Sequence, residues 1–244
     1  MVEQERRSTD RKVADYWDEH TDETYFGETY WLANPVINRH HQSKAAGGRD
    51  YESWVNFSVC NVETNPFPLS DYDAIYFNSS LHHMSDLDAI LIKRCAALKQ
   101  DGYLFVNEYI GPNRFTFSDR EKEVMQSVFH LIPEKYRVSH AEHDRGQIRK
   151  QVHYPDPAEV ERVDPSEAIH SEEIVDSLKR HFKIEEFNYT GGTLMQFMLL
   201  DIAGNFKESD AESMQILQLI FDIEDTLVAS GGLLPHFAMI IARP

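Results

Sequence analysis

The sequence predicts an α/β protein built around a parallel β-sheet, and three observations carry this prediction. An apolar strand at 73–78 (DAIYFN) is followed by a helix with an apolar stripe and by a second apolar strand at 103–110 (YLFVNEYI). Strand, helix and strand at this spacing form a parallel βαβ unit. Residues 54–63 (WVNFSVCNVE) alternate apolar and polar side chains, as a further strand does. Hydrophobic residues make up 41% of the chain, enough for a buried core.

Residues 1–54 are expected to form a helical arm in front of an α/β domain at 55–244. The arm is polar but rich in aromatic side chains, and residues 28–45 have a mostly helical pattern in which Pro35 marks a start or a kink. Such an arm either packs on a core or closes over a ligand, and both interpretations stay open.

Two central helices carry recognisable start signals. The first begins at Ser85, with Asp88 placed three residues later as in a capping box. Its apolar stripe consists of Leu87, Ile90, Leu91, Cys95 and Leu98. The segment QDG at 100–102 then turns the chain. The second helix, at 118–132, has Ser118 and Glu121 as its capping box.

The C-terminal half alternates a long irregular segment with regular elements. Residues 133–165 are charged and rich in histidine without periodicity, which predicts a lid, an insertion or a mobile loop. After it we expect a helix at 170–182 capped by Ser171, a strand at 183–189, a tight turn at Gly191–Gly192, helices at 193–203 and 208–229, and a last strand at 236–243.

The charge balance excludes several classes of partner. The formal net charge is −17, and binding to nucleic acid or to an anionic membrane needs a basic surface. The two cysteines, Cys60 and Cys95, lie in apolar runs and are expected to be buried free thiols. The N-terminus has no apolar signal region, and no apolar run is long enough to span a membrane. These features together favour a cytoplasmic location.

The stretch DYDAIYFNSSLHHMSDLDAILIKRCAALKQDGYLFVNEYIGPNRF resembles class I S-adenosylmethionine (SAM)-dependent methyltransferases. Asp73 stands before the strand that would be the fourth of that family, the segment SLHH (80–83) follows it, and LKQDGYL (98–104) leads into the fifth. EYIGPNRF, DPSEAIHSEEI and YTGGTLMQFMLLDIAGNF are similar to a bacterial subgroup that acts on small molecules. The resemblance implies a Rossmann-like methyltransferase fold with sheet order 3-2-1-4-5-7-6 and SAM as the cofactor.

One part of the family pattern is missing from the sequence. The family's first strand ends in a glycine-rich loop that lets the backbone approach the cofactor, and its second ends in a carboxylate for the ribose. Here the segment GGRDYESW leads directly into the strand at 54–63, which resembles the family's third. We therefore expect a truncated fold that lacks the first two strands and their helices. Gly191–Gly192 lies between a strand and a helix, where an anion could bind, but a plain tight turn is the preferred interpretation.

The candidate catalytic residues follow the two strands of the βαβ unit. Ligands of open α/β sheets gather at the carboxyl ends of the strands, and His82 and His83 lie at one such end. Either histidine could act as a general base, or could simply cap the next helix. Glu108 ends the next strand and could take a proton or bind a cation. The alternative for Glu108 is a salt bridge, for instance to Arg114.

The resemblance also implies residues that contact ligands. A sulfonium cation is stabilised by aromatic faces, and the expected cofactor-binding residues are Tyr16, Tyr25, Tyr30, Trp31, Glu63 and Asn78. The expected substrate-binding residues are Tyr109 and Arg114. No metal site is expected, because His40–His41 and the set His130, His140, His143 and His153 show no ligand spacing.

Two functions remain open from the sequence. The chain could transfer methyl groups to a small molecule at a rebuilt SAM site, or it could be an inactive relative that serves as a binding or assembly protein. With the first two strands lost, the third strand could pair with the fourth and give a five-stranded sheet; otherwise the fourth strand exposes an edge that invites pairing with another chain. We expect a homodimer or a higher homo-oligomer. Exchange between copies could then help to rebuild a pocket.

Overall fold

The computed structural model describes residues 71–244, which fall into two compact units. The described part of the sheet unit comprises 71–113, 166–190 and 236–244, and that of the helical unit comprises 114–165 and 191–235. The predicted arm and the predicted strand at 54–63 lie outside the described residues. So does the part of the chain where the first two strands are expected to be missing. The truncation therefore stays a prediction.

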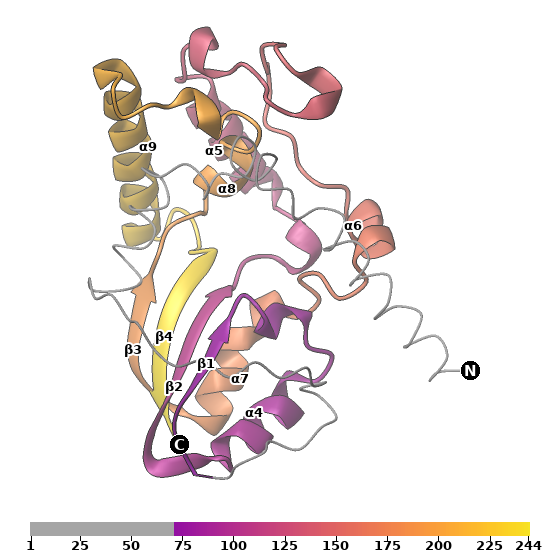
Figure 1. Ribbon diagram of the computed structural model, residues 1–244, viewed down its shortest axis with the longest axis vertical. Coiled ribbons are helices and arrows are strands. Elements are labelled where there is room, and N and C mark those ends of the chain that lie inside the picture. Colours follow the sequence, from indigo (N-terminus) through magenta and orange to yellow (C-terminus); the bar gives the residue numbers. More distant parts are fainter. Residues whose placement is uncertain (1–70) are drawn as a thin grey trace. The chain divides into compact units, whose positions relative to one another are not determined.

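The sheet unit contains a four-stranded mixed sheet in the order β1-β2-β4-β3 (Figure 1). Its strands are β1 (Tyr72–Asn78), β2 (Leu98–Tyr109), β3 (Lys183–Tyr189) and β4 (Phe237–Arg243). β1 pairs with β2 in parallel, whereas β4 is antiparallel to both β2 and β3. This order equals the 4-5-7-6 half of the sheet that the resemblance implies, so the Rossmann-like methyltransferase fold is confirmed for this part of the chain.

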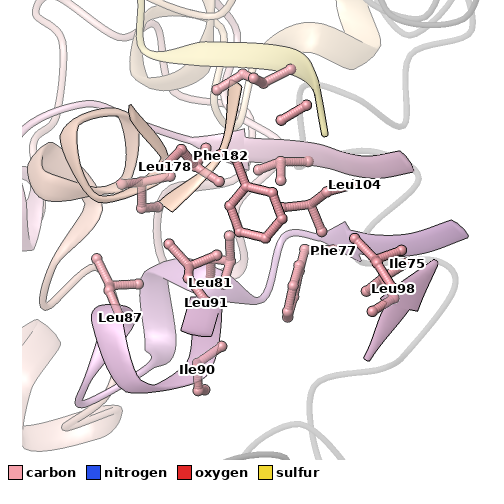
Figure 2. Close-up of a cluster of buried hydrophobic side chains, with 14 of the residues drawn as sticks. Ile75, Phe77, Leu81, Leu87, Ile90, Leu91, Leu98, Leu104, Leu178 and Phe182 are labelled. Atoms are coloured by element: carbon pink, nitrogen blue, oxygen red, sulfur yellow. The ribbon is translucent and has the colours of Figure 1, made fainter. Parts of the chain in front are cut away.

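Alternating side chains give this sheet one apolar face. Ile75 and Phe77 lie opposite Leu104 and Val106 on the neighbouring strand, and Val106 in turn pairs with Ile240. All five residues belong to one buried cluster, which α4 (Leu87–Cys95) and α7 (Ile174–His181) complete. Figure 2 shows side chains of these helices meeting those of the strands. Burying this apolar surface stabilises the sheet unit and fixes the register of its strands.

The QDG segment is an irregularity at the start of β2. Tyr72 pairs with Leu98 and Ala74 pairs with Tyr103, so the residues between Leu98 and Tyr103 bulge out of the ladder. A Cβ atom on Gly102 would lie 3.0 Å from the carbonyl oxygens of both Lys99 and Tyr72. Only glycine allows this close backbone approach without a shift, which explains its place in the predicted turn.

The helical unit consists of short helices and one long one. Its α-helices are α5 (Asp119–Phe129), α6 (Pro157–Val163), α8 (Met195–Met198) and α9 (Ala211–Ala229). Three 3-10 helices accompany them at Glu134–Tyr136, Glu142–Asp144 and Ala203–Asn205. Elsewhere 3-10 turns occur at Leu81–His83, Asn113–Phe115 and Ser171–Glu173. Among the described residues, no helix is both long enough and apolar enough to cross a membrane.

Several predicted helix ends are confirmed and others are wrong. The Ser118–Glu121 capping box at the start of α5 is present in both directions. The first central helix instead begins after Asp86, whose side chain accepts a hydrogen bond from the amide of Ala89 at 2.9 Å. Leu98, predicted to lie on that helix, belongs to β2.

Two C-terminal predictions also need correction. Ser171 opens a 3-10 turn rather than capping α7, and its hydroxyl donates to Oδ1 of Asn113 at 3.2 Å. The helix predicted at 193–203 shrinks to α8, because Asp201 adopts a left-handed φ of 64° that a continuing helix does not allow. The segment 133–165, predicted to be irregular, holds short helices and a single bridge between Val138 and Ile148. Its role as a lid stays a prediction.

Candidate functional site

Glu108 is the centre of a polar cluster at the carboxyl ends of β1 and β2. Its side chain is buried, with 1% exposure, and both of its carboxylate oxygens accept hydrogen bonds. Oε1 accepts from the backbone amides of Ser80 at 2.6 Å and Leu81 at 2.7 Å. Ser79 makes this possible with a left-handed φ of 48°, which turns the chain sharply after β1. The carboxylate therefore holds the loop that carries both candidate histidines.

His82 is the direct side-chain partner of Glu108. Its Nδ1 atom lies 2.7 Å from Oε2 of the glutamate, and the imidazole is itself buried with 6% exposure. A carboxylate only accepts hydrogen bonds, so Nδ1 carries a proton, and whenever the ring is neutral the lone pair is on Nε2. This arrangement fixes both the tautomer and the orientation of the ring.

A third segment of the sheet unit, around Ser166 and Glu167, reaches the same loop. The amide of Ile169 donates to the carbonyl of His82 at 3.1 Å and ties this segment to the loop. Glu167 then lies with Oε1 3.6 Å from Nε2 of His82 and Oε2 3.8 Å from Nε2 of His83. The two imidazole rings are 4.2 Å apart, and Nδ1 of His83 is 3.0 Å from the hydroxyl of Ser166.

The remaining described site candidates are less directly involved. Tyr109 is buried against the rings of His82, His236 and Phe237, and its hydroxyl donates to the carbonyl of Pro112. Asn78 lies exposed at the end of β1, where its Oδ1 accepts from the side chain of Asn107 at 2.8 Å.

Arg114 belongs to the helical unit, where its guanidinium donates to the carbonyls of Asp164 at 3.1 Å and Pro165 at 2.6 Å. The suggested salt bridge between Glu108 and Arg114 would join the two units and stays a prediction. The predicted cofactor-binding residues Tyr16, Tyr25, Tyr30, Trp31 and Glu63 lie outside the described residues. Their roles stay predictions.

The Gly191–Gly192 turn already contains an anion supplied by the chain itself. Glu224 of α9 is fully buried and accepts hydrogen bonds from the amides of Gly192 at 2.9 Å and Leu194 at 2.6 Å. Gly191 has a φ of +91°, and a Cβ atom there would lie 3.1 Å from the same carboxylate. The turn is therefore a structural one, as predicted, and its amides do not cradle a ligand.

A comparison with protein families finds a match for one part of the chain. Residues 30–106 match a family model described as a methyltransferase domain, and this match includes β1, the histidine loop, α4 and most of β2. The similarity to the methyltransferase family is thus shown for residues 30–106. The matched segment ends two residues before Glu108, so the family match contains the histidine loop but not its carboxylate partner. No curated protein matches the chain.

Solved structures that resemble the chain include three with 14–17% sequence identity to it. A structure titled as the [4+2]-cyclase SpnF has 16% identity and a TM-score of 0.36; the match covers 77% of this chain and 55% of that one. The chain thus spans about half of that protein's length. An S-adenosylmethionine-dependent methyltransferase from Mesorhizobium loti has 14% identity and a TM-score of 0.39, with coverage of 82% and 73%. The YcgJ protein from Bacillus subtilis has 17% identity and a TM-score of 0.28, with coverage of 86% and 75%.

The match of residues 30–106 to a methyltransferase domain implies SAM as the cofactor. The carboxylate of Glu167 stands beside the histidines, where negative charge would stabilise a sulfonium cation. Within 71–244, however, the glycine pair that could have formed a backbone cradle is filled by Glu224.

Sequence reasoning missed Glu167 and Ser166 as members of the site. They lie more than eighty residues after the histidines, and their position depends on the tertiary fold rather than on any local spacing. The available signal was the segment DPSEAIHSEEI, which resembles the bacterial subgroup and contains both residues. The sequence did predict His82 and Glu108 at neighbouring strand ends, and the structure brings these two together.

Proposed function

We propose that the protein transfers a methyl group from SAM to a hydroxyl or amine of a small molecule. The observation that carries this proposal is the buried pair of Glu108 and His82 at the carboxyl ends of two parallel strands. Ligands of α/β sheets bind at this edge, and a histidine whose ring is held by a carboxylate suits proton acceptance. The match of residues 30–106 to a methyltransferase domain supports methyl transfer as the reaction class. The kind of acceptor is inferred from the site alone.

Each residue of the pair has a distinct part in the proposed reaction. When bound, SAM supplies an electrophilic methyl carbon on a sulfonium sulfur. His82 accepts the proton of the acceptor's hydroxyl or amine through Nε2 as the nucleophile attacks. Glu108 is a positioning residue, because its carboxylate contacts the imidazole and the loop amides rather than the reacting atoms. Glu167 adds negative charge beside the histidines.

The proposal is tested by measuring S-adenosylhomocysteine released from SAM in the presence of small hydroxyl and amine acceptors. We expect acceptor-dependent release by the wild type. His82→Gln should lower kcat by roughly 10² to 10⁴, the usual contribution of a general base, while the KM for SAM changes little. Glu108→Gln should lower kcat because the ring loses its fixed orientation.

The matched control for these variants is His181→Gln. His181 also pairs with a carboxylate, since its Nε2 lies 2.9 Å from Oδ1 of Asp88 in the same unit. This variant should keep the wild-type rate. Equal kcat values for the wild type and His82→Gln would contradict the proposed role of the histidine, provided that circular dichroism shows both proteins folded.

One observation favours a second candidate function, that of an inactive relative that binds a partner. All three donors that reach Glu108 come from the chain itself, so the carboxylate could serve only to stabilise the loop. In that case Glu108→Gln would lower the melting temperature, and no acceptor would yield S-adenosylhomocysteine from SAM above the rate without protein.

A further inference from the structure

Two imidazoles and one carboxylate of the sheet unit converge on a small volume at the end of β1. His82, His83 and Glu167 each offer one ligand atom, and these three atoms all lie within 4.8 Å of one another. We propose that they bind a divalent first-row transition-metal ion of the zinc class. His82 and His83 are not among the histidines that were weighed as metal ligands from the sequence. Glu167 comes to lie beside them only through the fold.

The distances between the candidate ligand atoms suit one shared ion. Nε2 of His82 is 3.6 Å from Oε1 of Glu167, and Nε2 of His83 is 3.8 Å from Oε2 of the same carboxylate. A tetrahedral ion with bonds of about 2.0–2.1 Å holds its ligand atoms roughly 3.3 Å apart. The Glu167 side chain is 20% exposed, and a small rotation of it would bring its oxygens from 3.6 and 3.8 Å to this distance from the two Nε2 atoms.

Both histidines are held in the way that metal-binding histidines usually are. Nδ1 of His82 is hydrogen-bonded to the buried carboxylate of Glu108 at 2.7 Å, and Nδ1 of His83 to the hydroxyl of Ser166 at 3.0 Å. Such outer partners orient the ring, and a carboxylate partner also makes the opposite nitrogen a better donor to a metal. The outer partners thus leave Nε2 of each ring on the side of Glu167.

The composition of the cluster indicates the class of ion. Imidazole nitrogens prefer borderline cations such as Zn²⁺, Co²⁺, Ni²⁺ and Fe²⁺, whereas Mg²⁺ and Ca²⁺ prefer sites made of oxygen atoms alone. Glu167 and Glu108 carry negative charge that would offset the charge of the ion. Three protein ligands leave at least one coordination position for water or a small molecule.

Metal binding does not depend on the proposed methyl transfer. An ion on Nε2 of His82 would occupy the lone pair that proton acceptance needs, so one copy of the protein cannot use both roles at once. Binding is therefore measured with the metal alone, in the absence of SAM and of any acceptor. Failure of methyl transfer would leave this result unchanged, and failure of metal binding would leave the activity assay unchanged.

The experiment is calorimetric titration of chelator-treated full-length protein with Zn²⁺, together with Co²⁺ absorption spectroscopy. We expect one tight site per chain and visible d–d bands for the Co²⁺ form. His83→Gln and Glu167→Gln each remove one ligand from a partly exposed position, where the variants should still fold. Each should weaken Zn²⁺ binding by at least about tenfold and reduce the d–d bands.

Two controls test whether His181 or the His40–His41 pair contributes to the binding. His181→Gln removes a histidine that pairs with a single carboxylate, and His40→Gln/His41→Gln removes the adjacent histidine pair of the N-terminal region. Both should keep the wild-type affinity for Zn²⁺. The proposal is overturned if the wild type binds no Zn²⁺ at micromolar concentration, or if His83→Gln and Glu167→Gln bind it as tightly as the wild type.

Discussion

At the scale of single residues, two buried carboxylates hold the conformations of the loops around them. Glu108 holds the turn after β1 and the ring of His82, and Glu224 holds the glycine turn before α8. A buried carboxylate must be compensated by several donors, and both residues obtain them largely from backbone amides. Each therefore fixes a loop conformation that its neighbours alone would not prefer.

Asp201 is a buried carboxylate for which the cost of burial outweighs the nearby positive charge. We therefore expect it to make the stability of the protein depend on pH. Burial raises the pKa of Asp201, while the nearby Arg149 guanidinium partly offsets this effect and the Asp144 carboxylate adds to it. Because the folded-state pKa lies above the unfolded value of about 3.9, the protonated residue favours folding. This contribution is fully present below the unfolded pKa and is lost as the pH rises through the folded pKa.

Asp201→Asn should remove this pH dependence. Asparagine also tolerates the left-handed φ of 64°, so the backbone is preserved. We expect the variant to gain stability relative to the wild type as the pH rises above the unfolded pKa of about 3.9, measured by urea unfolding at several pH values. His143 and His153 face the same carboxylate and are present in both proteins. A difference in stability that stays constant over this range would contradict the account.

The site was predictable from sequence only where neighbouring strands place its residues. Consecutive parallel strands end at one edge of the sheet, so His82 and Glu108 were expected to lie near each other, and they are in contact. The ring orientation was not predictable, because it depends on the left-handed Ser79 and on two backbone amides. Glu167 could not be placed, because its approach depends on the packing of a distant segment against the histidine loop.

At the scale of elements, the turn before α8 depends on a contact with α9. Glu224→Gln should destabilise the protein by roughly 2–3 kcal/mol, because the new amide group would face backbone donors in a fully buried place. Glu212→Gln on the same helix is the matched control, since Glu212 forms an exposed pair with Lys135 and should matter little. Urea unfolding measures both, and equal midpoints for the two variants would show that the turn does not need the carboxylate.

Long elements with clear periodicity were the most predictable ones. The strands and the α5 capping box agree with the sequence because apolar alternation and local capping act over a few residues. The predicted N-cap of α4 was wrong by one position, since Ser85 and Asp86 are adjacent polar residues that can each cap a helix and the local pattern does not rank them. The predicted helix at 193–203 was too long, because α8 ends at Met198 and the left-handed Asp201 does not allow a helix to continue to residue 203.

At the scale of the whole molecule, the association state is the open question. Within 71–244, β1 pairs only with β2, and Tyr76 on β1 is 53% exposed. A strand with one unpaired edge favours pairing with another chain. We propose a homodimer, for which light scattering coupled to size-exclusion chromatography should give about twice the chain mass of 28.3 kDa. A mass equal to one chain at all concentrations would contradict this proposal.

The central claim is that this methyltransferase relative still uses SAM, and cofactor binding tests it most directly. Isothermal titration calorimetry should be carried out with SAM and, separately, with S-adenosylhomocysteine, on protein first stripped of ligand. The account predicts micromolar binding of both, at a site completed by residues beyond the described range or by a second copy. No heat and no thermal shift up to millimolar ligand would contradict it and would leave the Glu108–His82 pair as a structural feature of a binding protein.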